Sequence, residues 1–291
     1  MSPRIDIVVS GWAEAGRAWQ APAVRAAIGT LPQLYREVAA PPAGGGHVAW
    51  VMAGGDTWPD AVAAALQAGP AAVVVDQPTW ATPDAIGQVE RAAGTVPVIL
   101  AGSRTHAPQV RDLAALVEPV KDQIEWVDAL LVGGEASLFD ALATLQAAGL
   151  AVVTPPRLTA SPHGFVVEAT AGGAARAGVH LTVLQGAGYT PQAVIKAFGS
   201  FGSLAATAGD PLVAYPGEVI RIDQSGYRAE PTDYQTPRRV ALREVHAAVA
   251  GSLVSPHRLN SYVPVAALAG SAGRLGTEPA RQSSDGRSSI Q

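Results

Sequence analysis

Short apolar runs alternate with alanine-rich stretches of helical period along the first part of the chain. The apolar runs predict five strands, at residues Ile5 to Val9, Leu34 to Ala39, Val48 to Met52, Ala72 to Val75 and Val96 to Leu100. Helices are predicted at Pro22 to Ile28, from about Thr57, at Thr82 to Ala93 and at Gln109 to Leu116. Strands that alternate with helices form parallel sheets covered by helices. We therefore predict a Rossmann-like α/β domain over residues 1–118.

One helix is missing from this alternation. The second predicted strand is followed by Pro41, Pro42, Ala43 and three consecutive glycines. Proline and glycine are the two residues that a helix interior tolerates least. We expect a loop here in place of a crossover helix.

After about residue 120 the pattern changes to longer alternating runs separated by glycine-rich turns. Strands are predicted at Ile124 to Val132, Gly164 to Ala169, His180 to Gln185, Val194 to Ala197 and Val219 to Asp223, and helices at Leu138 to Ala148, Arg238 to Ala250 and Pro264 to Ala272. Alternation of this kind predicts an open, mostly antiparallel sheet with one face buried. Residues 119–276 are therefore predicted to form an α+β domain. The Ser- and Arg-rich residues 277–291 are predicted to be a disordered tail.

Composition and charge exclude several classes of protein. The formal net charge is -4 and no basic run stands out, so we expect no nucleic-acid partner. Cysteine is absent, which excludes disulfides, thiolate metal sites and a cysteine nucleophile. The sequence has neither an apolar run of about 20 residues nor a signal peptide, so we expect no membrane association and a cytoplasmic location. The spacing of His163, His180, His246 and His257 predicts no metal site.

The loop after the first predicted strand is where a Rossmann-like domain would hold a dinucleotide. Ser10, Gly11, Trp12 and Gly16 are the candidate cofactor-binding residues, but they do not form the G-x-G-x-x-G fingerprint in any register. Trp12 and Glu14 replace small uncharged residues that would face phosphate. We also expect no acidic residue at the end of the second strand to hold a ribose. The sequence thus predicts no cofactor, or weak NAD(P) binding.

Several motifs follow one another in an order that carries a resemblance. They are Asp76-Gln77-Pro78 after the fourth strand, Arg104-Thr105-His106-Ala107-Pro108 after the fifth, Gly133-Gly134 before Leu138-Phe139-Asp140, and Phe198 to Leu204. Their order and spacing resemble the Gfo/Idh/MocA family of sugar and cyclitol oxidoreductases over nearly the whole chain. The resemblance implies a catalytic site at positions Asp76, Gln77, Arg104, His106, Asp140 and Thr144.

Two of these positions lack the groups that the family's chemistry uses. In the family, the lysine of a Glu-Lys-Pro motif exchanges the hydroxyl proton, and Gln77 stands in its place. A carboxamide does not titrate near neutral pH. The family also has a histidine four residues after the aspartate, on the same helix face, where this chain has Thr144. The resemblance therefore implies the family's fold without its usual proton-transfer groups.

Three functions stay open. The first is a non-catalytic accessory or scaffold subunit that pairs with an oxidoreductase. The second is an NAD(P)-dependent oxidoreductase of a sugar-like or cyclic secondary alcohol with substituted catalytic groups. The third is a non-redox enzyme that reuses the cleft for a small-molecule ligand, with Asp76, Arg104, His106 and Asp140 as acid, base and anchoring groups. Structural roles compete with these, because Asp76 could orient a turn, and Arg104 and His106 could form a solvated pair.

A dense apolar stretch in the second half predicts association. Its members are Val194, Ile195, Phe198, Phe201 and Leu204. Neighbouring residues of a strand point to opposite faces, so Val194 and Ile195 cannot share one core. One set remains available to a partner. Since members of the family pair through this sheet, the resemblance implies a homodimer or a heteromeric complex with a related oxidoreductase.

Overall fold

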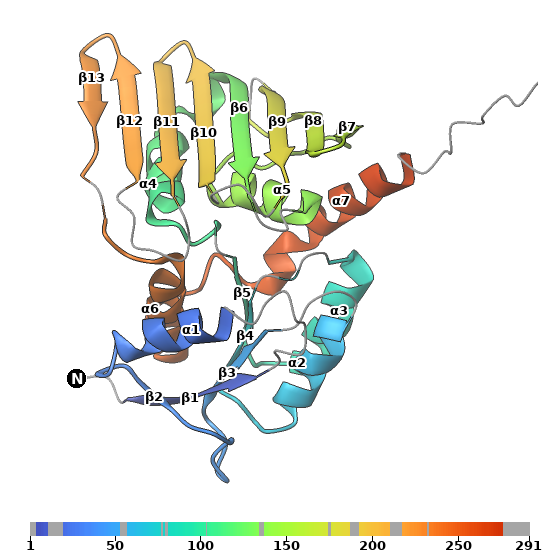
Figure 1. The fold of residues 1–291 in the computed structure, drawn as a ribbon, viewed down its shortest axis with the longest axis vertical. Helices are drawn as coiled ribbons and strands as arrows, with labels where there is room; N and C mark the ends of the chain where they lie inside the picture. The colour runs from blue at the N-terminus through green and yellow to red at the C-terminus, as the bar shows by residue number, and fades with distance from the viewer. Residues whose placement is uncertain are drawn as a thin grey trace, which may run out of the picture.

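Two β-sheets of different topology lie one above the other in the computed structural model (Figure 1). The structure describes residues 4–10, 20–52, 57–76, 78, 81–102, 104–133, 137–173, 176–186, 192–209, 217–231 and 233–275. The predicted tail at 277–291 lies outside these residues. None of the described helices is long and apolar enough to cross a membrane.

The first sheet confirms the Rossmann-like prediction. Its strands are β1 (Ile5–Ser10), β2 (Tyr35–Glu37), β3 (Val48–Val51), β4 (Ala72–Asp76) and β5 (Val98–Ala101). They are all parallel, in the order β2-β1-β3-β4-β5. Residues 38–47 carry the chain from β2 to β3 without a helix, as the proline and glycine run predicts. The strand order reverses between β1 and β3, which is where open α/β sheets bind ligands.

Helices cover both faces of this sheet, so every residue of β3, β4 and β5 is buried. One face carries α1 (Gln20–Gly29) and α6 (Pro237–Val249), and the other carries α2 (Trp58–Leu66) and α3 (Pro83–Ala93) (Figure 1). Trp50 faces the core formed with α1 and α6, and its neighbour Val51 faces the opposite core. Helix α6 comes from the range 119–276, yet Leu242 and Val245 pack in the core of the first sheet.

The second sheet has eight strands and is mostly antiparallel, as predicted. They are β6 (Ile124–Val132), β7 (Arg157–Ser161), β8 (Gly164–Thr170), β9 (Gly178–Leu184), β10 (Gln192–Gly199), β11 (Gly202–Ala208), β12 (Glu218–Asp223) and β13 (Gly226–Ala229). Their order is β13-β12-β11-β10-β6-β9-β8-β7, and only β6 and β9 run parallel. The helices of this half are α4 (Pro108–Val117), α5 (Leu138–Ala147) and α7 (Val263–Leu275). Strands β7, β11 and β13 were not predicted from the sequence.

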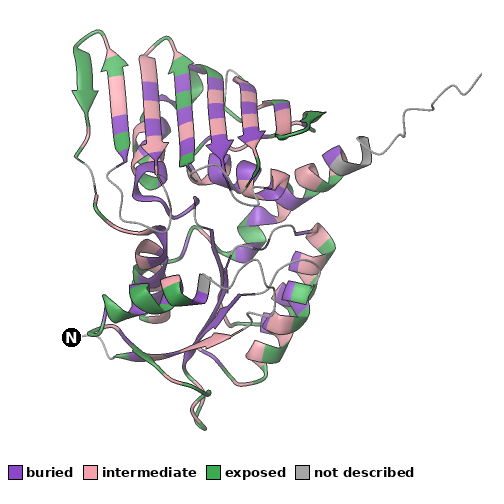
Figure 2. Cartoon of the chain, in the orientation of Figure 1, coloured by how far each residue is buried: buried purple, intermediate pink, exposed green. Residues whose placement is uncertain are grey.

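Burial alternates along these strands, which gives the sheet one core face and one outer face (Figure 2). On β10, Ile195 is buried against the helices, while Phe198 on the other face is 39% exposed. Leu204 of β11 joins the core, and Phe201 packs at its edge from the turn. The apolar stretch is therefore divided between the two faces, as the period of two predicts.

Candidate functional site

The site positions implied by the resemblance lie where the first sheet meets α5. Asp76 ends β4, Arg104 and His106 lie in the turn after β5, and Asp140 and Thr144 are on α5. Of the predicted cofactor residues, Ser10 ends β1, where its carbonyl accepts a hydrogen bond from the Met52 N–H at 2.9 Å. Gly11, Trp12, Gly16 and Gln77 lie outside the described residues.

Asp76 is bound by the protein on two sides. It is 1% exposed, and its Oδ2 accepts a hydrogen bond from Nε1 of Trp50 at 2.9 Å. The guanidinium of Arg238, on α6, lies with Nε 3.6 Å from the same oxygen. A buried carboxylate is stable only when it is paired and hydrogen-bonded. Asp76 thus joins β3, β4 and α6, and this agrees with the structural interpretation of the residue.

Arg104 connects the turn after β5 with the second sheet. Its Nη1 donates to Oδ2 of Asp140 at 2.6 Å, and its Nη2 donates to the carbonyls of Val132 and Gly133, both at 3.0 Å. The side chains of Arg104 and Asp140 are 9% and 16% exposed. The expectation of a solvated pair of Arg104 and His106 is wrong, because both residues are buried between the two halves of the chain.

Thr144 offers no group to a ligand. The residue is fully buried, and its hydroxyl donates to the backbone carbonyl of Asp140, one turn earlier on α5, at 2.7 Å. Ser137 caps the start of this helix, and its Oγ accepts the Asp140 N–H at 3.1 Å. Among the described residues around Phe139 and Ala143, a cavity of about 10 Å³ remains. That volume holds roughly one water molecule.

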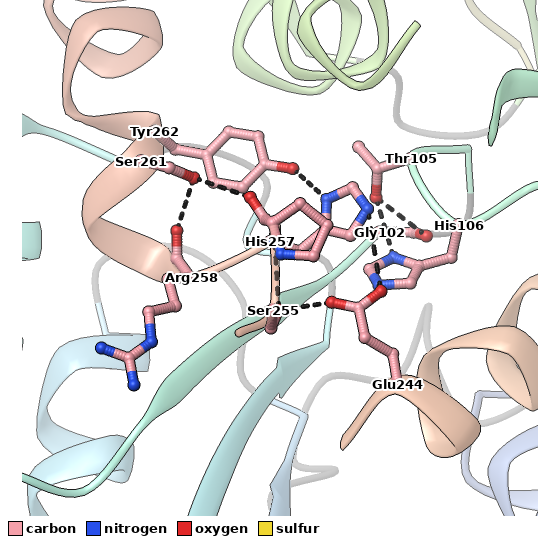
Figure 3. Close-up of polar contacts among 10 residues, drawn as sticks. Gly102, Thr105, His106, Glu244, Ser255, His257, Arg258, Ser261 and Tyr262 are labelled. Atoms are coloured by element: carbon pink, nitrogen blue, oxygen red, sulfur yellow. Dashed lines mark hydrogen bonds and ion pairs between the residues drawn. The ribbon is translucent and has the colours of Figure 1, made fainter. Parts of the chain in front are cut away.

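His106 belongs to a different cluster, with Glu244 of α6 and His257 (Figure 3). The two imidazole rings are 4.2 Å apart between centroids. No local spacing in the sequence connects Glu244 and His257 with His106, so their proximity could not be predicted. They meet because the chain returns beside β5, where the Leu100 N–H donates to the His257 carbonyl at 2.8 Å.

The end of β2 corrects one expectation about the cofactor site. The strand stops at Glu37, two residues before its predicted end, so an acidic residue does end it. Oε1 of Glu37 accepts a hydrogen bond from Nε of Arg25 at 2.6 Å. A ribose at this position would compete with Arg25 for the carboxylate. The pairing of Glu37 with Arg25, together with the Trp12 and Glu14 that the sequence has in place of small uncharged residues, does not fit a tightly held dinucleotide.

No protein-family model and no curated protein matches this chain. Solved structures do match over almost its full length. An oxidoreductase from Sinorhizobium meliloti is 13% identical with a TM-score of 0.72, covering 94% of this chain and 97% of that one. KijD10, a 3-ketoreductase from Actinomadura kijaniata solved with TDP-benzene and NADP, is 16% identical with a TM-score of 0.64, covering 93% and 97%.

These structural neighbours are described as an oxidoreductase and a 3-ketoreductase. At such low sequence identity the likeness establishes the fold. The chain therefore has the two-domain fold of these oxidoreductases, with a Rossmann-like half and an α+β half built on an open sheet.

Proposed function

We propose that this chain is a degenerate member of the Gfo/Idh/MocA family that acts as a non-catalytic accessory or scaffold subunit. The observation that carries the proposal is that both carboxylates at the described family positions, one on β4 and one on α5, are bound by the protein itself. Asp76 is held by Trp50 and Arg238, and Asp140 is held by Arg104. The pair of Arg104 and Asp140 also connects the two halves of the molecule.

Hydride transfer from an alcohol also needs a group that accepts the hydroxyl proton. Gln77 and Thr144 do not provide one, and the chain has only two lysines. Lys121 pairs with Glu118 at 2.7 Å in the 3-10 helix Glu118–Gln123, and Lys196 is exposed on the outer face of β10. We therefore expect neither lysine to take over the proton transfer that the family's lysine performs.

A partner subunit is proposed for the outer face of the second sheet. Cross-strand registers align Tyr227, Ile222, Phe198 and Trp126 in one row that runs from β13 to β6 through Ser203. These four large apolar side chains are all exposed. Beside the row lie polar groups such as Asp128 and His180, which pair at 3.1 Å. An apolar strip with polar neighbours is typical of a protein interface.

A titration with NADH and NADPH, followed by fluorescence, tests the non-catalytic function. We expect no saturable binding by the purified chain, while a nicotinamide-dependent dehydrogenase measured in parallel binds. We also expect that Gln77→Lys alone creates no dehydrogenase activity, because Thr144 and the first loop remain unchanged. Substantial turnover by this single variant would contradict the proposal.

Glu37 supports the alternative of a working NAD(P)-dependent oxidoreductase, because a carboxylate at the end of β2 is the ribose-binding group of Rossmann domains. If NADH binds saturably and Glu37→Gln weakens that binding by tenfold or more, the alternative is correct. An exposed variant such as Glu168→Gln, on the second sheet, provides the matched control.

A further inference from the structure

Three side chains from distant parts of the chain converge beside β5. His106 lies in the turn after this strand, Glu244 on α6, and His257 in the segment between α6 and the 3-10 helix Leu259–Tyr262 (Figure 3). The backbone fixes the third position, because an antiparallel bridge joins Ile99 and Arg258. The three groups are therefore held by three different parts of the fold.

The spacing of their ligand atoms suits one metal ion. Nε2 of His106 is 3.5 Å from Oε2 of Glu244, and Nε2 of His257 is 3.9 Å from the same oxygen. One ligand atom of each residue lies within 4.8 Å of the others. In a tetrahedral zinc site with bonds of about 2.0 to 2.1 Å, ligand atoms lie roughly 3.3 Å apart. Small side-chain movements would bring this cluster to that geometry.

Hydrogen bonding fixes which nitrogen of His106 faces the cluster. The Thr105 hydroxyl donates to the Gly102 carbonyl at 3.2 Å, so its oxygen accepts the Nδ1–H of His106 at 3.1 Å. Nε2 is then the nitrogen that faces Glu244, and it has no hydrogen-bond partner among the described residues. The side chain of His106 is fully buried, and its Nε2 lies 3.5 Å from Oε2 of Glu244. Both atoms could therefore bind one cation placed between them.

Each of the three candidate ligands also has a hydrogen-bond partner on the side away from the cluster. Thr105 holds His106, Nδ1 of His257 lies 2.6 Å from the Tyr262 hydroxyl, and the Ser255 hydroxyl donates to Oε1 of Glu244. Metal-binding histidines and carboxylates usually have outer partners of this kind, which fix the tautomer and direction of each ligand.

We propose that His106, Glu244 and His257 bind one divalent transition-metal ion, with zinc as the ion that the ligand set fits best. Two imidazole nitrogens and one carboxylate oxygen are ligands that zinc accepts, whereas calcium and magnesium prefer oxygen ligands alone. The ion would join the β5 turn, α6 and the segment that leads to α7. It would therefore stabilise the packing of these three segments against one another, whether or not a dinucleotide binds.

The test is a zinc titration of the full-length chain after treatment with a chelator, by calorimetry or competition with a chromophoric chelator. We expect one Zn²⁺ per chain and a higher unfolding temperature with zinc. Glu244→Gln and His257→Gln should each weaken binding by at least about 100-fold, and Thr105→Val by about 10- to 100-fold. His180→Gln, on the outer face of the second sheet, should bind zinc as the unmodified chain does.

Far-ultraviolet circular dichroism without metal shows whether each variant is folded. If one ligand variant does not fold, the other ligand variant and Thr105→Val still test the site. Absence of zinc binding by the unmodified chain would overturn the proposal, and the cluster would then be an ion pair that shares a proton. Binding that is equally strong in the folded ligand variants would also overturn it, because the ion would then bind elsewhere.

Discussion

The guanidinium of Arg104 connects the turn after β5 with both β6 and α5, through three hydrogen bonds. Its charge is compensated by Asp140 in a largely buried pair. When one partner of such a pair is removed, the other charge remains buried without compensation, and the cost is much larger than the net value of the pair. Arg104 should therefore be more important for stability than any exposed arginine.

We expect Arg104→Ala to lower the free energy of unfolding by about 3 to 5 kcal/mol. Asp140 would lose its buried partner, and the carbonyls of Val132 and Gly133 would lose a donor. Urea unfolding at neutral pH measures the effect. The control is Arg91→Ala, at an exposed position near the end of α3, for which we expect a change within about 0.5 kcal/mol. Equal effects of the two substitutions would contradict the linking role of Arg104.

A buried histidine predicts a loss of stability in acid. His47, before β3, is 1% exposed, and burial lowers its pKa from the ordinary 6.5, against the opposing charge of Asp6. The unfolded chain takes up the proton near pH 6.5 while the folded chain does not. The contribution of His47 is thus present above that pH and is lost as the pH falls, by at most about 1.4 kcal/mol per pH unit.

Urea unfolding at pH 8, 6 and 5 tests this expectation. The unmodified chain should lose more stability between pH 8 and 5 than His47→Gln does. His163→Gln, at an exposed position between β7 and β8, should keep the pH dependence of the unmodified chain. The expectation is wrong if His47→Gln and His163→Gln show the same dependence.

At the scale of elements, replacement by alanine should lower the free energy of unfolding at one glycine and raise it at another. Gly164 begins β8 with φ +146°, and an added Cβ would lie 1.8 Å from the Val183 carbonyl oxygen of β9. We expect Gly164→Ala to cost about 2 to 3 kcal/mol. Gly270 lies in α7 with no atom within 4 Å of an added Cβ. There alanine should stabilise by about 0.5 to 1 kcal/mol, as it does within helices.

Denaturant unfolding of both variants provides the measurement, and each variant serves as the other's control. A stable Gly164→Ala would mean that β8 and β9 pair less closely than the register from Gly164 to Leu184 describes. A destabilised Gly270→Ala would mean that α7 contacts something at this position.

Elements with strong local signals could be predicted from the sequence. Helix α3 begins where Thr82 and Pro83 predict, and the Thr82 hydroxyl accepts the Ala85 N–H at 3.1 Å. The long strand β6 has its predicted bounds, Ile124–Val132. Strand β11 was missed because its sequence, GSLAATA, consists mostly of glycine, serine and alanine, which have little β-propensity. Strand β13 is exposed throughout, so it shows no apolar alternation.

The candidate site was less predictable because its contacts are non-local. The resemblance placed Arg104 and Asp140 at the site, and the structure pairs them directly. The cluster of His106 with Glu244 and His257 depends on α6 packing on the first sheet. The sequence of α6 gives its helical period but not the sheet that it covers, so no spacing rule could bring these three residues together.

At the scale of the whole molecule, the chain crosses between the two halves more than once. It leaves the first sheet after β5, builds the second sheet, returns through α6 and then leaves again through α7. Helix α6 packs against α1, β4 and β5. Removal of residues after β13 would therefore uncover one face of the first sheet as well as shorten the second half. The two halves are not independent units that could be separated at residue 118.

The outer face of the second sheet leads to the last prediction, which concerns association. We expect light scattering of the purified chain to report about twice the monomer mass of 29.6 kDa. The double variant Phe198→Asp with Ile222→Asp places two charges in the apolar row and should give monomers, because burial of an unpaired charge is costly. Val254→Asp, in a loop where the residue is 79% exposed, should leave the dimer intact.

Two results would contradict this prediction in different ways. If the double variant remains a dimer, the chain associates through another surface. If the unmodified chain is a monodisperse monomer, the homodimer is excluded, and co-expression with a related oxidoreductase then tests the heteromeric complex. Phe198, Ile222 and Trp126 belong to one exposed apolar row. If the chain also fails to bind a co-expressed oxidoreductase, this row is not a protein interface. The accessory-subunit proposal would then lose its partner surface.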